Sequence, residues 1–201
     1  MKNKKVDNPK IHLIVLNWND KELSRKCLSS IEKVSYPNYE VLIVDNNSED
    51  GSVEFFKKHF PNYDILALED NLKYAGGNNA AVDYLKPDEN DFLVFINNDT
   101  IVSSDFLDHL VDPFLNDPNC IITVPKILFA MDINKIWYAG GLVNMWKGTI
   151  DHIGIRNFDA PRYSFLMETD YATGCCLCIS YTDFKKLNDF ADLSSDELIG
   201  G

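Results

Sequence analysis

Residues 91–100 combine an apolar run with two amides and a carboxylate that could hold a metal ion. Residues 92–96 have the length and composition of a buried strand, and Asn97, Asn98 and Asp99 follow it directly. A buried strand that ends in a carboxylate places this charge at the edge of a sheet, where open α/β folds bind their ligands. Oxygen ligands of this kind suit a hard divalent cation that carries phosphate. Asp99 is therefore the candidate metal ligand.

Three earlier apolar runs also end in acidic or amide side chains. They are residues 11–16 before Asn17, residues 41–44 before Asp45, and residues 63–68 before Glu69, Asp70 and Asn71. If the four strands are parallel, their carboxyl ends meet at one edge of the sheet. A single polar strand end is usually an ordinary turn, but four in succession favour a shared binding site.

The polar strand ends carry groups that suit a nucleotide. Asp45 can accept hydrogen bonds from the N–H edge of a base or from a ribose hydroxyl, and Trp18 can either stack on a base or simply cover the sheet edge. Lys73 is a candidate phosphate contact, although a lone exposed lysine is usually only solvated. Gly76-Gly77 is expected at a helix N-terminus, where free N–H groups favour an anion. A tight loop without a ligand is the simpler interpretation of these glycines.

Strand-like and helix-like patterns alternate through the first half of the chain. The expected strands are residues 11–16, 40–45, 64–68 and 92–97. The expected helices are residues 21–34, 53–60 capped by Ser52, 78–85 opened by the glycine pair, and 105–116 capped by Ser104. Strands that alternate with helices predict a parallel sheet with right-handed connections. We therefore expect an α/β fold, a three-layer α/β/α sandwich with a mostly parallel central sheet.

The pattern changes near residue 120. Residues 121–129, 137–146 and 170–179 are strand-like and rich in aromatic residues, and residues 181–187 have a short helical pattern. No linker or low-complexity tract separates this part from the first. We therefore expect one domain over residues 1–201, with two halves, 1–119 and 120–201.

Composition limits the classes of function. The chain has 201 residues, of which 45% are hydrophobic and 25% charged, which suits one sizeable soluble domain. The net charge of −12 argues against nonspecific binding to nucleic acid, which needs a basic surface. No apolar stretch has the length of a signal peptide core or a membrane span, so the expected location is the cytoplasm. Four lysines in the first ten residues suit peripheral contact with the inner face of a membrane, although terminal lysines are usually only solvated.

The five cysteines do not form a recognisable metal or disulfide pattern. The number is odd, and three of them, Cys175, Cys176 and Cys178, lie within four positions. A zinc site would need a second cysteine pair or nearby histidines, and the four histidines are isolated in the sequence. Because free cysteine is commonly buried, we expect residues 175–179 to form a buried strand.

Several common nucleotide and hydrolase motifs are missing. There is no Gly-x-Gly-x-x-Gly after the first expected strand, no P-loop and no Gly-x-Ser-x-Gly. Residues 16–22 also lack the glycine-rich basic loop that nucleotidyltransferases usually carry at this place, so that class ranks third among the candidates.

Four segments together resemble family-two glycosyltransferases of the A-type fold, especially the rhamnosyltransferase-like group. They are residues 14–19 (IVLNWN), 44–52 (VDNNSEDGS), 71–79 (NLKYAGGNN) and 95–100 (FINNDT), with weaker matches at 137–141 (WYAGG) and 173–176 (TGCC). Each segment is modest alone, but their order and spacing are specific and cover nearly the whole chain. The resemblance implies transfer of a sugar, with inversion, from a nucleotide-diphosphate sugar to a saccharide or lipid-linked acceptor, as in cell-envelope polysaccharide biosynthesis.

The resemblance also implies roles for individual residues. Asp99 would coordinate Mg²⁺ or Mn²⁺ on the diphosphate, and Asn97 stands where many members have Asp, which weakens metal binding. Residues 1–119 would form the donor half. The donor contacts would be Asn17, Trp18, Asp45, Asn71, Lys73, Gly77, Asn78 and Asn98. Residues 120–201 would form the acceptor half, in which Trp137, Tyr138 and Trp146 could stack on a sugar.

An inverting transferase also needs a carboxylate that takes the acceptor proton. The family carries an acidic pair for this step, after a stretch that Asp196-Glu197 resembles, and this chain then stops at Gly201. We expect the base to lie beyond Gly201 and the chain to be C-terminally truncated, while Asp192, Asp196 or Glu197 as a substitute is the alternative. A non-catalytic module that binds nucleotide sugars is the alternative function.

Overall fold

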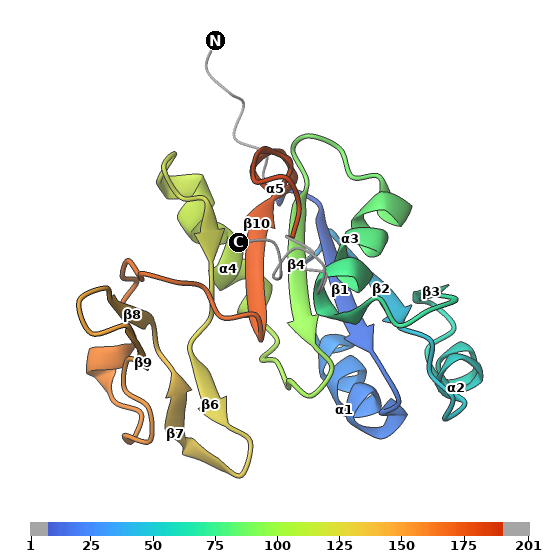
Figure 1. Ribbon diagram of the computed structural model, residues 1–201, viewed down its shortest axis with the longest axis horizontal. Coiled ribbons are helices and arrows are strands. Elements are labelled where there is room, and N and C mark those ends of the chain that lie inside the picture. Colours follow the sequence, from blue (N-terminus) through green and yellow to red (C-terminus); the bar gives the residue numbers. More distant parts are fainter. Residues whose placement is uncertain (1–7, 191–201) are drawn as a thin grey trace, which may run out of the picture.

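Six strands form one central sheet in the computed structural model, which describes residues 8–190 (Figure 1). Their order across the sheet is β3-β2-β1-β4-β10-β5. The strands are β1 (Ile11–Asn17), β2 (Tyr39–Asp45), β3 (Asp64–Ala67), β4 (Phe92–Asn97), β5 (Ile122–Thr123) and β10 (Cys176–Ser180). The first four are parallel, whereas β10 is antiparallel to both of its neighbours. The predicted α/β class with a mostly parallel sheet is confirmed.

Helices cover both faces of this sheet. They are α1 (Lys21–Ile31), α2 (Ser52–His59), α3 (Lys73–Leu85), α4 (Phe106–Asn116) and α5 (Tyr181–Lys186), with a 3₁₀ turn at Pro161–Tyr163. Alternate residues of β1 point to opposite faces, so Leu13 packs in the cluster that includes Leu28 and Leu107, and Ile14 packs in the cluster that includes Val82 and Phe184. The first cluster places α1, α2 and α4 in one layer, and the second places α3 and α5 in the other. The three-layer prediction is therefore confirmed.

Three predicted helix starts are wrong. Ser52 is the first residue of α2 and not its cap, because Gly51 precedes it with a φ of 79° and Asp50 accepts hydrogen bonds from Ser52. Ser104 does not cap α4, which begins after Asp105 without a side-chain cap bond. The third helix, α3, begins at Lys73 and not after the glycine pair. In each case a side chain or turn just outside the helix changes where its first hydrogen bond forms.

The second half adds two small sheets beside the central one (lower left in Figure 1). One pairs β6 (Ile127–Phe129) with β7 (Asp132–Tyr138), and the other pairs β8 (Gly141–Asn144) with β9 (Thr149–His152). The predicted strand over residues 121–129 is interrupted at Pro125, which cannot donate to a ladder. The predicted cysteine-rich strand is confirmed as β10, in which Cys176 and Cys178 are buried.

No helix among residues 8–190 combines the length and the apolar character needed to cross a bilayer.

Candidate functional site

A hydrogen-bond network joins the carboxyl ends of β1, β2 and β4. Asn17 Nδ2 donates to Asp45 Oδ1 at 2.8 Å, which links the last residues of β1 and β2. Ser24 Oγ donates to Asn17 Oδ1 at 2.7 Å, and Asn98 Nδ2 donates to Ser24 Oγ at 2.8 Å. The network thus reaches the residue that precedes Asp99 at the end of β4. The prediction that these strand ends meet at one edge of the sheet is confirmed.

Asn17 and Asp45 are inside this edge and not on its surface. Their exposed fractions are 0% and 2%. Both carboxylate oxygens of Asp45 already accept hydrogen bonds, Oδ1 from Asn17 and Oδ2 from the backbone N–H of Ser48 at 2.9 Å. In this arrangement Asp45 fixes the turn after β2, and its contact with a base stays a prediction.

Asn46 forms a second connection that the sequence did not single out. Its side chain is buried, Nδ2 donates to Asn71 Oδ1 at 2.8 Å, and Oδ1 accepts from the Leu72 N–H at 2.9 Å. Nδ2 also lies 3.1 Å from the carbonyl oxygen of Lys73. Asn46 therefore ties the end of β2 to the start of α3. Its position directly after Asp45, at the end of an apolar run, was the signal that could have identified it.

The predicted helix start at the glycine pair is wrong, because α3 begins at Lys73. Asn71 Oδ1 accepts from the Lys73 N–H at 2.8 Å, so the helix is initiated before the glycines. The glycines serve close packing instead, since a Cβ on Gly77 would lie 2.7 Å from Leu16 Cδ1 of β1. Asn78 is 1% exposed and donates to a carbonyl oxygen one turn earlier.

The N–H groups of Leu72 and Lys73 are already bonded to Asn46 and Asn71, so the N–H groups that remain for a ligand at the start of α3 are those of the residues directly after Lys73. Lys73 is exposed and lies directly after the segment that Asn46 and Asn71 hold in place. A helix N-terminus with a lysine at its first residue suits an anionic group, such as a phosphate. The predicted phosphate contact thus moves from Gly77 and Asn78 to the beginning of α3.

Trp18 and Asp99 are the exposed members of the predicted set at the ends of β1 and β4. Trp18 is 57% exposed. Asp99 is exposed and makes no ion pair or hydrogen bond through its carboxylate within residues 8–190. Its charge acts on two thiols: burial first, and then Asp99, raises the pKa of Cys27 to about 12. Burial and Asp99 also raise the pKa of Cys175, although a hydrogen bond with Thr100 opposes the shift.

The groups at the Asp99 turn fit a divalent ion that arrives with a diphosphate. Within the described part of the chain, no three His, Cys, Asp or Glu side chains are grouped to hold a metal by themselves. The amide nitrogen of Asn98 donates to Asn17 and Ser24, which leaves its amide oxygen available as a second ligand next to Asp99 in the sequence. Mg²⁺ commonly binds through one or two carboxylates together with substrate phosphates. One carboxylate and one amide oxygen are consistent with an ion that the substrate phosphates help to hold, and not with a site in which the protein supplies every ligand.

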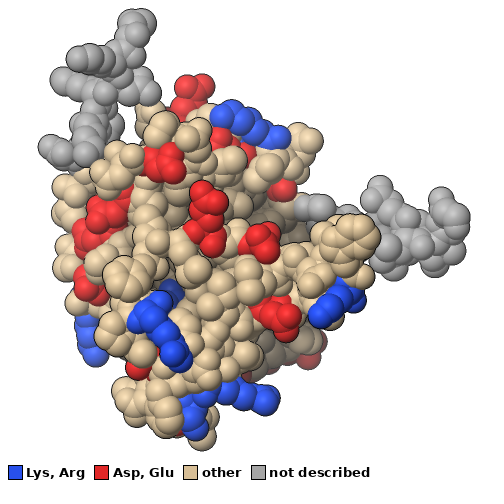
Figure 2. Space-filling view, turned by 90° about the vertical axis from the view of Figure 1, so that its left-hand side faces the viewer, with Lys and Arg blue, Asp and Glu red and all other residues tan. Residues whose placement is uncertain are grey.

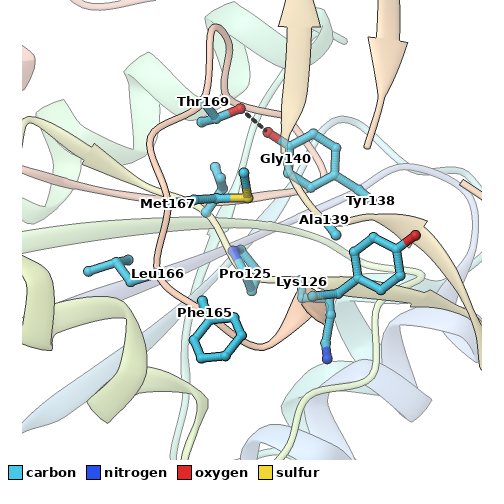
Figure 3. Close-up of a pocket in the computed structure, with 11 residues that line it drawn as sticks. Pro125, Lys126, Tyr138, Ala139, Gly140, Phe165, Leu166, Met167 and Thr169 are labelled. Carbon is cyan, nitrogen blue, oxygen red and sulfur yellow. Dashed lines mark hydrogen bonds between the residues drawn. The ribbon is translucent and has the colours of Figure 1, made fainter. Parts of the chain in front are cut away.

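A cavity of about 90 Å³ lies in the second half, and none of the residues that line it belongs to the predicted donor set (Figure 3). Tyr138, Phe165 and Met167 line it together with Lys126, and the Tyr138 hydroxyl lies 3.3 Å from Thr169 Oγ1. Ligand pockets for drug-sized molecules usually exceed about 300 Å³, so this cavity is too small for a nucleotide sugar. This cavity is therefore not a candidate for the donor site.

The predicted acceptor-side aromatics have three different environments. Tyr138 is buried and donates to the carbonyl oxygen of Tyr171 at 2.7 Å. Trp137 is partly buried, with its ring edge-on to His152 at 4.7 Å between centroids. Trp146 is fully exposed. The candidate bases Asp192, Asp196 and Glu197 lie outside the described residues.

Comparison with solved structures finds the following similar chains. A solved mannosyltransferase from Pyrobaculum calidifontis, PcManGT, in complex with GDP-Man and Mn²⁺, is similar over 94% of this chain and 49% of its own, with 17% identity and a TM-score of 0.63. S. aureus TarS 1-349 is similar over 60% of this chain and 40% of its own, with 24% identity and a TM-score of 0.47. The TarS complex with UDP-GlcNAc gives 22% identity, coverages of 60% and 38%, and a TM-score of 0.48.

No curated protein matches the chain. The chain spans about half the length of the mannosyltransferase that it resembles, and this likeness establishes the nucleotide-sugar transferase fold. The family described as Glycosyl transferase family 2 matches residues 12–185, which is most of the sequence. These findings, together with the sheet and its polar edge, show that the chain belongs to glycosyltransferase family 2.

Proposed function

We propose that this protein binds a nucleotide-diphosphate sugar across the carboxyl ends of β1, β2 and β4 and transfers the sugar with inversion. The observation that carries the proposal is the Asp45–Asn17–Asn98 network, which holds three strand ends together and leaves Trp18 and Asp99 exposed beside it. The start of α3 is tied to the same edge by Asn46. A single ligand could therefore contact all of these segments.

The proposal divides the predicted residues into two groups. Trp18, Lys73 and Asp99 are exposed and would touch the donor: Trp18 at the base, Lys73 at the phosphates, and Asp99 at the divalent ion. The second group shapes the edge through the hydrogen bonds and the close packing described above. It consists of Asn17, Asp45, Gly77 and Asn78, which are buried, Asn98, which is partly buried, and Asn71, which is exposed.

A bound Mg²⁺ or Mn²⁺ would offset the charge that develops on the leaving diphosphate. Lys73 and the free N–H groups at the start of α3 would stabilise the same charge from the protein side. The second half would hold the acceptor hydroxyl in line with the anomeric carbon, which removes much of the entropic barrier. The proton of that hydroxyl requires a carboxylate, for which residues 8–190 offer no assigned candidate.

The same proposal includes the subgroup, the donor sugar, the acceptor and the location of the protein. The four sequence segments together support the rhamnosyltransferase-like group and a hexosyl or rhamnosyl donor. The acceptor is a saccharide or a lipid-linked saccharide of the cell envelope, with the protein in the cytoplasm at the inner face of the membrane. Nucleic acid is not among the proposed partners, because the net charge is −12.

Isothermal titration with UDP, GDP and dTDP sugars, each with and without Mn²⁺, tests the donor site. We expect one nucleotide to bind with an affinity that Mn²⁺ increases at least about tenfold, and Asp99→Ala to abolish that increase. Asp83→Ala on the exposed side of α3 is the matched control and should bind as wild type. A wild type without Mn²⁺-dependent binding, or an Asp99→Ala variant that keeps it, would refute the site.

A further inference from the structure

A hollow of about 550 Å³ lies on the β8–β9 hairpin, in the second half of the chain. Sites for small molecules usually have volumes of about 300–1,000 Å³, so this hollow is large enough for a small saccharide. Met145 and Trp146 line it at the tip of the hairpin, and Asp151 of β9 and Asp170 beside β8 also line it. The hollow therefore combines exposed apolar surface with two carboxylates.

The pairing of β8 with β9 places several of these groups on one face of the hairpin. Leu142 of β8 lies opposite Asp151 of β9, and side chains of directly opposed residues point to the same face. Asn144 is two residues further along β8 and therefore shares that face. The hollow is thus built on one face of a two-stranded sheet and is bounded at one end by the turn that carries Trp146.

The backbone around the hollow is held by contacts within the chain. The Asp170 N–H donates to Gly141 O at 3.0 Å, and Asp170 Oδ2 accepts from the Val143 N–H at 2.9 Å. The Tyr171 ring packs against Gly141 on the other face, where a Cβ would lie 2.1 Å from Cε1 of that ring. The hollow is therefore formed before a ligand arrives, as is usual for small-molecule sites.

The polar atoms that remain free in the hollow match the hydroxyl groups of a sugar, which both donate and accept. Asp170 Oδ1 and the two carboxylate oxygens of Asp151 accept no hydrogen bond from residues 8–190. Asn144 Oδ1 accepts from the Lys147 N–H at 3.0 Å, which leaves Asn144 Nδ2 as a donor. Trp146 is fully exposed and offers a flat apolar surface to the C–H face of a pyranose ring.

The charge of the hollow argues against an anionic ligand. Among the described residues that line it, Asp151 and Asp170 carry charge, and no Lys or Arg offsets them. Figure 2 faces the side of the molecule on which β8 and β9 lie, and Asp and Glu side chains are spread over much of that side. An organic cation would need an aromatic cage, whereas Trp146 is the one aromatic residue among those described residues. An uncharged saccharide therefore fits the hollow best.

We propose that this hollow binds part of an uncharged saccharide and serves as a subsite for the acceptor. Trp146 stacks on a sugar ring, and Asp151 and Asp170 accept hydrogen bonds from its hydroxyl groups. The hollow selects neutral sugars over uronic acids and sugar phosphates, because two carboxylates repel an anion. Saccharide binding here does not require the proposed sugar transfer, whereas its role for the acceptor rests on that proposed function.

Titrations followed by NMR, without nucleotide, test the subsite. The indole N–H signals of the three tryptophans are observed in ¹H–¹⁵N spectra and assigned from single variants. The probes are D-glucose, D-galactose, L-rhamnose, N-acetyl-D-glucosamine and maltose. We expect at least one of them to shift the Trp146 signal with a Kd of about 1–10 mM and to leave the Trp18 signal unchanged. D-Glucuronate and D-galacturonate should bind at least about tenfold more weakly than the best neutral sugar.

Three variants separate the hollow from the rest of the second half. Trp146→Ala should weaken saccharide binding at least about tenfold, and Asp151→Asn about threefold, as followed through the backbone N–H signals of residues 142–151. Phe158→Ala is the matched control, because it removes an aromatic side chain that is 68% exposed and does not line the hollow. It should bind as wild type does. Equal thermal unfolding of the three variants shows that folding is intact.

Three results would overturn the subsite. They are no shift of the Trp146 signal by any neutral sugar up to about 50 mM, equal binding by Trp146→Ala and Phe158→Ala, and a shift caused only by the cations tetramethylammonium and D-glucosamine. The last result would assign the hollow to a cationic ligand. Donor binding is measured separately by calorimetry. Failure of saccharide binding alone therefore refutes this inference, and failure of nucleotide binding alone refutes the proposed donor site.

Discussion

Lys73 has a backbone conformation that glycine adopts more readily, with a φ of 59°. A non-glycine residue in this region is strained, and such strain is often found at functional sites. Asn46 and Asn71 hold the backbone of this turn through the contacts of residues 71–73. We interpret the strained backbone of Lys73 as a functional feature. It places a lysine side chain at the start of α3, where the diphosphate is proposed to bind.

Replacement of Lys73 by glycine should separate stability from binding. Lys73→Gly relieves the strained φ and is expected to raise the free energy of unfolding by roughly 0.5–1 kcal/mol. It removes the cation from the phosphates and should weaken nucleotide binding about tenfold. Urea unfolding and titration calorimetry measure the two effects.

Lys86 provides the matched control for this experiment. It ends the same helix with a φ of 49°, so Lys86→Gly should stabilise the protein to a similar extent and leave nucleotide affinity unchanged. If Lys73→Gly binds nucleotide as wild type does, Lys73 does not contact the phosphates.

For single residues, the sequence predicted where a side chain lies better than it predicted which groups that side chain contacts. Asn17, Asp45 and Asn98 were identified because polar residues ended apolar runs, and they do meet. Their partners were not predictable, because the side chains that bond to the buried Asn17, those of Ser24 and Asp45, are brought close to it only by the fold. The glycine pair was misassigned because a close helix–strand contact and an anion site use the same residue type.

Among the elements, α3 is connected directly to the loop that enters β10. The Tyr74 hydroxyl donates to Gly174 O at 2.8 Å, across 100 positions of sequence. The next residue, Cys175, accepts from the Asn97 N–H at 2.9 Å through its carbonyl oxygen, and its Sγ lies 3.4 Å from Thr100 Oγ1. Burial, and then nearby cysteines, raises the pKa of Tyr74 to about 12, so the phenol remains a donor at neutral pH. This loop therefore sets the spacing between the start of α3 and the Asp99 turn.

Tyr74→Phe should loosen this spacing without unfolding the protein. Loss of one hydrogen bond of about 1 kcal/mol is expected to lower Mn²⁺-dependent nucleotide affinity roughly threefold to tenfold. Tyr138→Phe is the control, because Tyr138 also donates to a backbone carbonyl, at 2.7 Å, but lies in the second half. It should reduce stability and leave affinity unchanged. Equal affinities for both variants and wild type would show that the Tyr74 contact is only structural.

Elements were predictable where one physical signal dominated. The bounds of the strands that build the parallel sheet were predicted to within one residue, because continuous apolar runs have few alternatives when both faces are buried. Residues 121–175 were predicted less well, since short strands such as β5 and β6 depend on pairing partners far away in the sequence. Helix starts were missed where an outside asparagine or glycine decided the first turn.

At the scale of the whole molecule, the edge of the sheet opposite the proposed donor site holds a separate polar cluster. At the amino ends of β1 and β4, His12 is 2% exposed and its Nε2 lies 2.8 Å from Asp91 Oδ2. Its Nδ1 is 2.6 Å from Glu40 Oε1, without hydrogen-bond geometry. Lys10 approaches the other oxygen of Glu40 at 2.9 Å. No predicted donor residue takes part in this cluster.

Asp91→Ala is therefore expected to affect stability alone. It leaves a buried ring nitrogen without its partner, and the free energy of unfolding should fall by roughly 2–4 kcal/mol. Asp88→Ala, at an exposed neighbour, should change it by less than about 0.5 kcal/mol. Urea unfolding measures both, and nucleotide affinity measured well below the midpoint should equal that of wild type. A loss of affinity in Asp91→Ala would mean that the two edges are coupled.

Because β10 pairs with β4 and is made much later, the central sheet is completed late in the synthesis of the chain. Its partners in β4, such as Val94 beside Cys178, are made more than eighty residues earlier during synthesis. Until Cys176–Ser180 leaves the ribosome, β4 is an edge strand. Its backbone N–H and C=O groups on the β10 side are unpaired, and a strand of another chain can add to them. Nascent protein is thus exposed to misassembly for the time that those intervening residues take to be translated, and completion of the sheet ends that exposure.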